Sequence, residues 1–375
     1  MSAAALLDAL EARGVRFFAG VPDSYLHAFC AELSRRYPAE RNVVAANEGG
    51  AVAIACGHYL ATGEAPLVYM QNSGLGNAVN PLASLTNPEM LGVPMLLLVG
   101  WRGDPYHGDH VQHALQGRAT PALLDALGIP HVELPCDDLA AAAAVAEALR
   151  LAREAGGPAA MLVPKGVLST GKSPVVDGSP LPSREEAICA VLDAAPPDAI
   201  FSATTGRASR ELFHVREARG EGHAHDFLNV GSMGHASSVA LGIALAHPER
   251  RVVCLDGDAA LIMHMGSLAP VSKLDVPNLL HVVLNNGLHE SVGGQPSAGG
   301  DVSFTAIARA CGYATADGPA SSPGEAAAAI RSLCGLARPA FLDFRIRGGI
   351  RGDMPGLEVD PKAMREGLMD ELGAL

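Results

Sequence analysis

The sequence predicts an α/β protein with two doubly wound parallel-sheet domains. Short, almost continuous apolar stretches alternate with helical patterns, as expected for parallel strands that are covered on both faces. The alternation is interrupted once, by the Ser-, Pro- and Gly-rich segment GKSPVVDGSPLP at residues 171–182, and then it resumes. We therefore expect an N-terminal domain at 1–168, a linker at 169–183 and a C-terminal domain at 184–375, with no middle domain. The 375 residues are enough for two cores of ordinary size.

The first half shows the alternation clearly. Three of its apolar strands end in polar or glycine-rich loops, at residues 20–24, 47–50 and 72–77. Because open parallel sheets bind ligands at the carboxyl ends of their strands, these loops are candidate site segments. We predict strands at 15–19, 43–46, 67–71 and 94–99, and helices at 3–13, 51–62 and 81–86.

The second half repeats the alternation without an obvious repeat of the sequence itself. Its strands carry Val, Leu and Phe in runs, and its helices are rich in small residues. We predict strands at 199–202, 252–255, 281–284 and 340–345, and helices at 184–194, 231–245 and 361–375.

Composition limits the partners and the location of the protein. The net charge of −13 disfavours nucleic acid and anionic membranes, because both require a basic face. The seven cysteines are odd in number, scattered and without a CxxC, which favours reduced thiols in a cytoplasm. The N-terminus does not resemble a signal peptide, and apolar runs stay short of the ~20 residues that a membrane span needs. We expect a cytoplasmic protein without nucleic-acid or membrane partners.

Two strand ends in the second half carry oxygen-bearing side chains. The strand at 252–255 leads to Gly257, Asp258 and Ala259, and the strand at 281–284 leads to Asn285-Asn286-Gly287. Carboxylate and amide oxygens are hard ligands, suited to a Mg²⁺ ion that holds a diphosphate. Either piece alone is also consistent with a plain turn, because Gly, Asp and Asn favour turns.

Together the two pieces resemble the signature of thiamine-diphosphate enzymes, which is GD(G/A), 25 intervening residues and NN. The resemblance implies that both domains have the thiamine-diphosphate-binding fold. It implies Mg²⁺ ligands at Asp258, at the Asn286 side chain and at the backbone carbonyl of Leu288, and cofactor contacts from Gly257 to Ala260. The family often has Gly where this chain has Ala259. A positive φ there would strain alanine by roughly 1 kcal/mol.

Glu48 ends a predicted strand in the motif ANEGGA, ahead of a small-residue helix. The pattern alone is explained by a carboxylate that favours a helix N-terminus. The resemblance implies instead that Glu48 faces the pyrimidine N1′ of thiamine diphosphate and shares a proton with it, helped by burial.

The resemblance also implies cofactor contacts from Gly231, Ser232 and Met233, with Met233 beneath the bent cofactor. A lone Met would otherwise be core packing. Thr205 is expected near the diphosphate, although a plain turn is the alternative there.

The motifs GVPDSYL, NSGLGN, ATTGRASRELF, VGSMGHAS and LNNGLHESVGGQP resemble phosphonopyruvate decarboxylases, with sulfopyruvate decarboxylases as close relatives. The resemblance runs from about Gly14 to Arg345. It implies decarboxylation of 3-phosphonopyruvate to phosphonoacetaldehyde and CO₂ through a thiamine ylid and an enamine, in phosphonate and antibiotic biosynthesis. His110 and Val111 replace a Glu-Pro pair of the family. The alternatives are therefore sulfopyruvate or another 2-oxo acid as substrate, a carboligase, or a non-catalytic regulatory subunit of the same fold.

A small anionic 2-oxo acid needs cationic or N–H donors. Arg118 and Arg207 are further candidates, for which a surface role is the simpler interpretation. Glu48 and Asp258 lie in different predicted domains, so the resemblance implies a homodimer or a dimer of dimers with active sites at the subunit interface. Our catalytic candidates are Glu48, His113, Ser24 and Asp23, and our substrate-binding candidates are Ser24, Asn77, His113, His235 and His289.

Overall fold

The protein was analysed as a computed structural model, which describes residues 1–168, 178–274, 276–349, 351–357 and 359–374. The chain divides into two compact units. The first holds residues 1–173 with 292–295, and the second holds 174–291 with 296–375. Most of the predicted linker, residues 169–177, lies outside the described residues.

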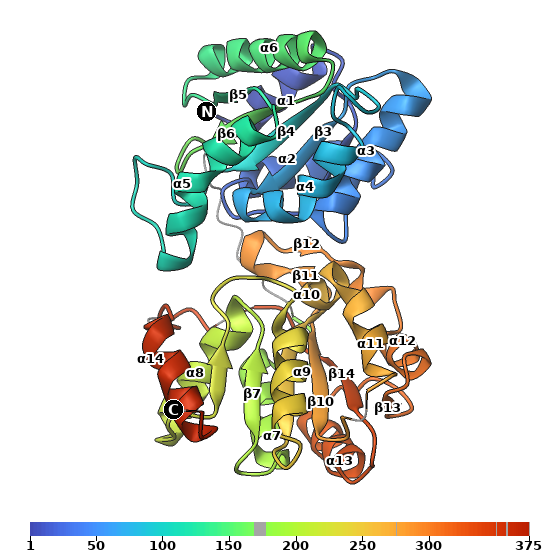
Figure 1. Cartoon of the computed structure of the whole chain (residues 1–375), viewed down its shortest axis with the longest axis vertical. Helices are drawn as coiled ribbons and strands as arrows, with labels where there is room; N and C mark the ends of the chain where they lie inside the picture. The colour runs from blue at the N-terminus through green and yellow to red at the C-terminus, as the bar shows by residue number, and fades with distance from the viewer. Residues whose placement is uncertain (169–177, 275, 350, 358, 375) are drawn as a thin grey trace. The chain divides into compact units, whose positions relative to one another are not determined.

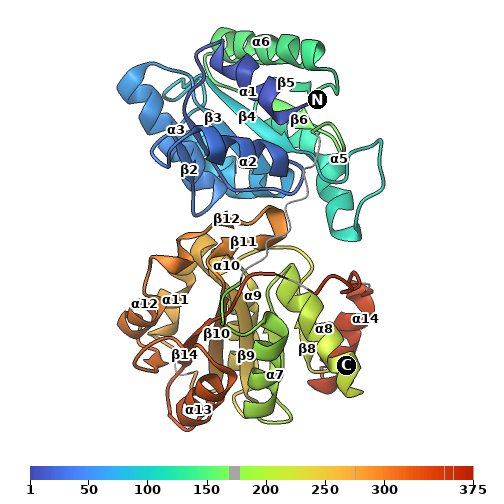
Figure 2. The ribbon, with the colours of Figure 1, turned by 180° about the vertical axis from the view of Figure 1, so that it is seen from behind.

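The first unit contains a six-stranded parallel sheet in the order β2-β1-β3-β4-β6-β5 (Figure 1). Helices α1, α2 and α6 lie on one face of the sheet (Figure 2). They bury leucine, valine and phenylalanine side chains against it. Helices α3, α4 and α5 cover the other face. The strands are β1 (Phe18–Gly20), β2 (Asn42–Val44), β3 (Leu67–Gln71), β4 (Met95–Gly100), β5 (His131–Glu133) and β6 (Pro158–Val163). The helices are α1 (Ala3–Glu11), α2 (His27–Arg36), α3 (Glu48–Thr62), η1 (Asn72–Gly74), α4 (Leu75–Ser84), α5 (Val111–Ala126) and α6 (Asp138–Ala155).

The second unit contains another six-stranded parallel sheet, in the order β13-β14-β10-β9-β7-β8. Its strands are β7 (Ile200–Ala203), β8 (Asp226–Leu228), β9 (Val252–Gly257), β10 (Leu279–Asn285), β13 (Ala314–Thr315) and β14 (Ala340–Arg345). The two-residue strands β11 (Leu288–His289) and β12 (Gln295–Pro296) form a separate small sheet, and the segment 292–295 that is assigned to the first unit includes the first residue of β12. Its α-helices are α7 (Arg184–Ala194), α8 (Arg207–Arg219), α9 (Ala236–Ala246), α10 (Asp258–Met263), α11 (Leu268–Val271), α12 (Phe304–Ala310), α13 (Pro323–Cys334) and α14 (Pro361–Glu371). Short 3₁₀ turns lie at η2 (Met265–Ser267), η3 (Glu290–Val292) and η4 (Ala298–Gly300).

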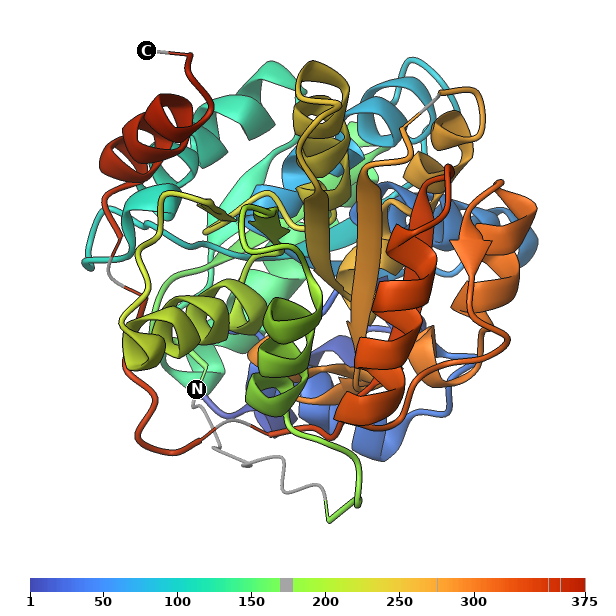
Figure 3. The same cartoon turned by 90° about the horizontal axis from the view of Figure 1, so that it is seen from below.

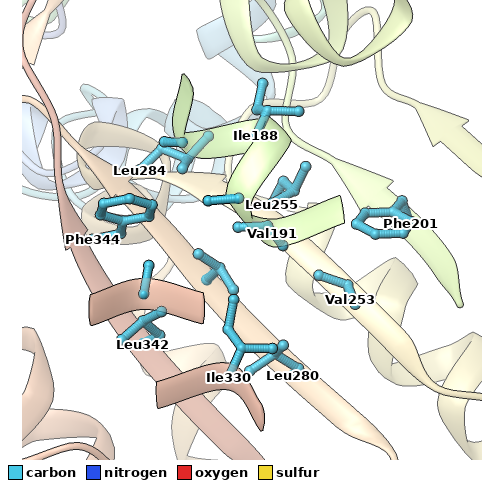
Figure 4. Close-up of a cluster of buried hydrophobic side chains, with 14 of the residues drawn as sticks. Ile188, Val191, Phe201, Val253, Leu255, Leu280, Leu284, Ile330, Leu342 and Phe344 are labelled. Carbon is cyan, nitrogen blue, oxygen red and sulfur yellow. The ribbon is translucent and has the colours of Figure 1, made fainter. Parts of the chain in front are cut away.

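The second sheet is also covered on both faces. Helices α7, α8 and α13 pack on one face, and α7 and α13 lie side by side there (Figure 3). Their core contacts include Ile188, Leu284 and Phe344 (Figure 4). Helices α9, α11 and α12 cover the opposite face. Both sheets are therefore doubly wound and parallel, and the predicted fold class is confirmed.

The register of β9 and β10 places two strand ends next to each other. Leu284 of β10 pairs with Gly257 of β9, so Asp258 and Asn285 follow at the same edge of the sheet. Both strands are almost completely buried, which explains their apolar runs. The two strand ends that carry these polar side chains are therefore neighbours in the fold.

Several local predictions were wrong. The helix predicted at 81–86 is α4, which begins six residues earlier at Leu75, and the strand predicted at 15–19 is β1, which begins only at Phe18. The predicted helix at 231–245 begins only at Ala236, because Ser232 and Gly234 adopt φ values of 46° and 82° that a right-handed helix excludes. Helix α3 begins earlier than predicted, at Glu48, since the Asn47 side chain caps it by accepting from the backbone N–H of Gly50 at 2.8 Å. The C-terminal helix ends at Glu371. Among the described residues, no helix is both long enough and apolar enough to span a bilayer.

Candidate active site

Asp258 lies at the carboxyl edge of the second sheet, where β9 ends and α10 begins. The residue is 2% exposed. Burial raises the pKa of its carboxyl group to about 6, opposed by hydrogen bonds from the Ser297 hydroxyl and from backbone N–H groups that include those of Asn286 and Ala259. These partners are neutral. The buried carboxylate is thus a group whose negative charge a bound cation would stabilise.

The Asn286 amide is held at both ends. Its Nδ2 donates to a carboxylate oxygen of Glu290 at 2.8 Å, and its Oδ1 accepts from the backbone N–H of Leu288 at 3.1 Å. Strand β11, which begins at Leu288, contacts α10. The three predicted ligands would offer a carboxylate oxygen from Asp258, an amide oxygen from Asn286 and the backbone carbonyl oxygen of Leu288, and hard oxygens of this kind fit Mg²⁺.

Gly299 leaves room for the Asp258 carboxylate. A Cβ at this position would lie 2.5 Å from Asp258 Oδ2, so no larger residue fits without movement. The Gly299 carbonyl accepts from Asn285 Nδ2 at 2.9 Å and from Arg345 at 3.0 Å, which ties the segment to the ends of β10 and β14. Sequence reasoning missed both Ser297 and Gly299, because they lie about 40 residues after Asp258 in a stretch without a motif.

Ala259 does not strain the motif. It lies in the first turn of α10, and Ser232 is the non-glycine residue with positive φ among those that the structure describes. The cost that we considered for alanine at a positive φ does not arise. Ala259 and Ala260 are both buried within the helix.

The turn before α9 holds an unusual backbone conformation. Ser232 has a φ of 46°, which costs a non-glycine residue about 1–3 kcal/mol. Asn229 stabilises the turn, since its Oδ1 accepts from the Gly231 N–H at 3.1 Å and its Nδ2 donates to the Ser232 carbonyl at 3.3 Å. Met233 is half-buried in this turn. Strained turns of this kind are common where a ligand is held, which agrees with the predicted role of residues 231–233.

The end of β7 provides donors for an anion. Thr204 Oγ1 is buried and has no hydrogen-bond partner among the described residues. Gly206 adopts a φ of 90°, and helix α8 follows it without a side-chain cap, so N–H groups of its first turn are available. Thr205 lies between them and is half-buried. This arrangement fits the diphosphate position expected for Thr205.

Glu48 is closely packed within the first unit. It is the first residue of α3, is 4% exposed, and accepts from Asn77 Nδ2 at 2.8 Å through Oε2. Burial raises the pKa of the carboxyl group, and the hydrogen bond from Asn77 opposes this increase. Gly74 allows the close approach, because a Cβ there would lie 2.3 Å from Glu48 Oε1. Asn77, which we predicted on the substrate side, contacts Glu48.

Two predicted residues, Ser24 and His113, lie near Arg102, a residue that we had not singled out and that follows β4 by two positions. Its Nη1 donates to Ser24 Oγ at 3.1 Å, and its Nε and Nη2 bind Asp109 at 2.7 and 2.6 Å. Burial, reinforced by the charge of Arg102, lowers the pKa of His113 to about 4. The His113 Nδ1 is buried without a hydrogen-bond partner among the described residues. The arrangement presents a cation, a hydroxyl and a neutral imidazole together.

Asp23 lies beneath this group and is completely buried. Burial raises its pKa, while a hydrogen bond of 2.5 Å from Gln71 Nε2 opposes the rise. Its other oxygen accepts from the backbone N–H of Tyr25 at 2.9 Å, which shapes the loop after β1. Burial alone would also raise the pKa of Asp109, but hydrogen bonds from Arg102 and from backbone N–H groups hold it below its usual range.

The remaining candidates differ in exposure. His289 is half-buried, and burial lowers its pKa to about 4. His235 is exposed, and its Nδ1 lies 3.1 Å from the Met233 carbonyl. Arg118 is exposed, whereas Arg207 lies 3.7 Å from a Glu290 oxygen. His235, Arg207 and His289 belong to the second unit, whereas Arg102 belongs to the first.

Comparison with known proteins agrees with this geometry. Residues 2–129 match the model described as the N-terminal TPP binding domain of thiamine pyrophosphate enzymes, and residues 204–344 match the C-terminal TPP binding domain. The two matches together cover more than half of the chain, so the chain belongs to the thiamine pyrophosphate enzymes.

Curated relatives narrow the class. The chain is 37% identical over 333 residues to phosphonopyruvate decarboxylase of Streptomyces viridochromogenes, covering 84% of this chain and 80% of the relative. The enzyme of the same name from Streptomyces hygroscopicus is 36% identical, with the same coverage. Sulfopyruvate decarboxylase of Methanosarcina acetivorans is 27% identical, covering 82% of this chain and 81% of its own. The chain belongs to the thiamine-pyrophosphate-dependent decarboxylases, which confirms the resemblance.

Two glycines near Glu48 provide a matched test of this pocket. Gly74→Ala places a Cβ against the Glu48 carboxyl group and should lower decarboxylase activity about 100-fold or more, the scale of a lost acid–base group. Gly76→Ala makes the same change two residues later, in the first turn of α4, where a Cβ would have open space. It should keep the activity and stabilise α4 by about 0.5–1 kcal/mol. Activity and thermal unfolding of both variants are the measurements. Equal activities would show that the Glu48 position does not depend on Gly74.

Proposed function

We propose that this protein decarboxylates 3-phosphonopyruvate to phosphonoacetaldehyde and CO₂, with thiamine diphosphate and Mg²⁺ as cofactors. The observation that carries the proposal is the 37% identity, over 84% of the chain, to a phosphonopyruvate decarboxylase. The buried carboxylates of Glu48 and Asp258 support it, because each is suited to one end of the cofactor. The place of the reaction would be phosphonate biosynthesis, in the cytoplasm.

In this proposal Asp258, the Asn286 amide oxygen and the Leu288 carbonyl hold Mg²⁺, which binds the diphosphate. Thr205 and the first turn of α8 add neutral donors to the diphosphate, and the turn at 231–233 supports the aminopyrimidine. When it is bound, thiamine diphosphate supplies the nucleophilic carbon and the electron sink that loss of CO₂ from a 2-oxo acid requires. Binding of the metal must displace any proton on Asp258. The affinity for Mg²⁺ should therefore decrease as the pH falls below about 6.

Glu48 is the proposed proton carrier. Its pKa is raised by burial, so the carboxyl group holds a proton more readily than an exposed glutamate does. Asn77 donates to Oε2 and thereby fixes the rotation of the carboxyl group. This leaves Oε1 to share a proton with the pyrimidine N1′ atom. Gly74 keeps the space beside Oε1 clear of a side chain.

Arg102, Ser24 and His113 are the proposed receptors for the substrate's anionic groups. A phosphonate accepts well from a guanidinium and from hydroxyl groups. Two of the guanidinium nitrogens are occupied by Asp109, so Nη1, already near Ser24, is the part that faces a ligand. His113 is neutral near pH 7, because its pKa is lowered to about 4, and can donate or accept a hydrogen bond. Asn77, His235 and His289 remain candidates of the same kind.

Glu48 and Asp258 belong to different units of the chain. We propose that each active site combines the first unit of one subunit with the second unit of another, in a homodimer or a dimer of dimers. Closed two-fold dimers are the commonest soluble assemblies, and they would supply two equivalent sites.

Phosphorus NMR of phosphonopyruvate with the enzyme, thiamine diphosphate and Mg²⁺ tests the substrate. We expect the signal of phosphonoacetaldehyde, and faster turnover than with sulfopyruvate or pyruvate. Glu48→Gln should reduce turnover about 10²–10⁴-fold while cofactor still binds. A preference for sulfopyruvate or pyruvate would contradict the phosphonate assignment. Absence of turnover with all three acids would favour a regulatory subunit, and an acyloin formed with an added aldehyde would reveal a carboligase.

A paired set of variants tests the role of Arg102. Asp109→Asn keeps the guanidinium charge, so KM for phosphonopyruvate should stay the same or fall. Arg102→Gln combined with Asp109→Asn removes both charges without leaving either unpaired, and KM should rise about tenfold to hundredfold, as for a lost charged hydrogen bond. Steady-state kinetics measures both. The same KM in the two variants would exclude Arg102 from substrate binding.

A further inference from the structure

A buried ion cluster lies beside the proposed metal ligand Asn286. Glu290, whose side chain is 5% exposed, forms an ion pair with Arg184, and Arg184 forms a second pair with Glu211 at 2.7 Å. Arg207 lies 3.7 Å from the other Glu290 oxygen. All four residues belong to the second unit. Burying charged groups costs free energy, so stability alone does not explain a cluster of this kind. We therefore asked whether it has a specific geometric role.

The Glu290 carboxylate is fixed from several directions. Its Oε2 accepts from Arg184 and from Asn286 Nδ2, the latter at 2.8 Å. Its Oε1 accepts from the backbone N–H of Gly349 at 2.7 Å. These contacts come from α7, from the loop after β10 and from the chain after β14, so the carboxylate cannot rotate without losing several hydrogen bonds.

The contact with Asn286 determines which end of the amide is available. An asparagine amide can bind a metal only through its oxygen, and a half-turn about its last bond would present the NH₂ group instead. A carboxylate is an acceptor only, so Glu290 accepts the NH₂ end and disfavours the half-turn. The backbone N–H of Leu288 is a donor only and selects the same orientation through Oδ1. The second lone pair of Oδ1 is then available to a metal.

We propose that Glu290 is a positioning residue that orients the Asn286 amide for the metal, an inference that rests on the Mg²⁺ site proposed above. Glu211 provides the comparison. It contacts Arg184 within the same cluster, but no described contact joins it to Asn286. Glu290 therefore acts on the metal ligand, and Glu211 acts on the stability of the cluster.

The test measures binding of Mn²⁺, as a substitute for Mg²⁺, by paramagnetic resonance with saturating thiamine diphosphate. Glu290→Met removes the acceptor while keeping the side-chain length, and should weaken Mn²⁺ binding about 10- to 100-fold, as for other residues that support metal ligands. Glu211→Met removes a carboxylate from the same cluster and should keep the wild-type affinity. Glu290→Gln retains an oxygen for Asn286 and should also keep it. Equal losses in both Met variants would overturn the proposal.

The substitution Asn286→Asp provides a second test, which does not require the Glu290→Met variant to fold. Asn286→Asp alone places two carboxylates side by side and should weaken Mn²⁺ binding. Asn286→Asp with Glu290→Gln restores a donor beside the new carboxylate and should recover the affinity. The same affinity in the two variants would show that residue 290 does not control residue 286. If the wild-type protein with thiamine diphosphate does not bind Mn²⁺, the proposed metal site itself fails, and this result is distinct from a failure of Glu290.

Discussion

The structure depends on one constraint, a carboxylate kept from water at the carboxyl edge of each sheet. Parallel strands that are buried on both faces end at a common edge, so each edge gathers the loops of several strands. In the second unit this edge buries Asp258 among neutral donors, and in the first it buries Glu48 beside Asn77. Burial without a cationic partner is unfavourable for both. A metal ion would stabilise one of them, and a shared proton the other.

Different surroundings give the two carboxyl groups different tasks. Asp258 accepts hydrogen bonds from Ser297 and from backbone N–H groups, and Gly299 packs against it, so its carboxylate is held in a fixed position that suits an ion site. Among the described residues Glu48 accepts from one side-chain donor, Asn77, and a glycine lies beside the other oxygen, so this oxygen is suited to proton exchange. The strained turn at Ser232 adds a preformed surface on the second unit. These features fit one cofactor with a metal-bound diphosphate and a base that accepts a proton.

The sequence predicted the fold class, the family and the residues that follow strand ends in recognisable motifs. Asp258, Asn286 and Glu48 became candidates because they stand in short motifs that resemble those of the family. Arg102, Ser297 and Gly299 were not, because their roles depend on contacts with residues that are remote in sequence or carry no local pattern. Ser232 was placed in a helix, since small residues alone do not reveal a positive φ. Periodicity thus predicted the sheets, whereas the lining of the site required tertiary structure.

The central claim is that Glu48 of one subunit and Asp258 of another serve the same cofactor. Coexpression of Glu48→Gln and Asp258→Asn chains with different affinity tags allows the mixed dimer to be purified. One of its two sites would then contain both native carboxyl groups, so we predict about half of the wild-type activity, while each variant alone is inactive. A mixed dimer as inactive as its parents would contradict the shared site.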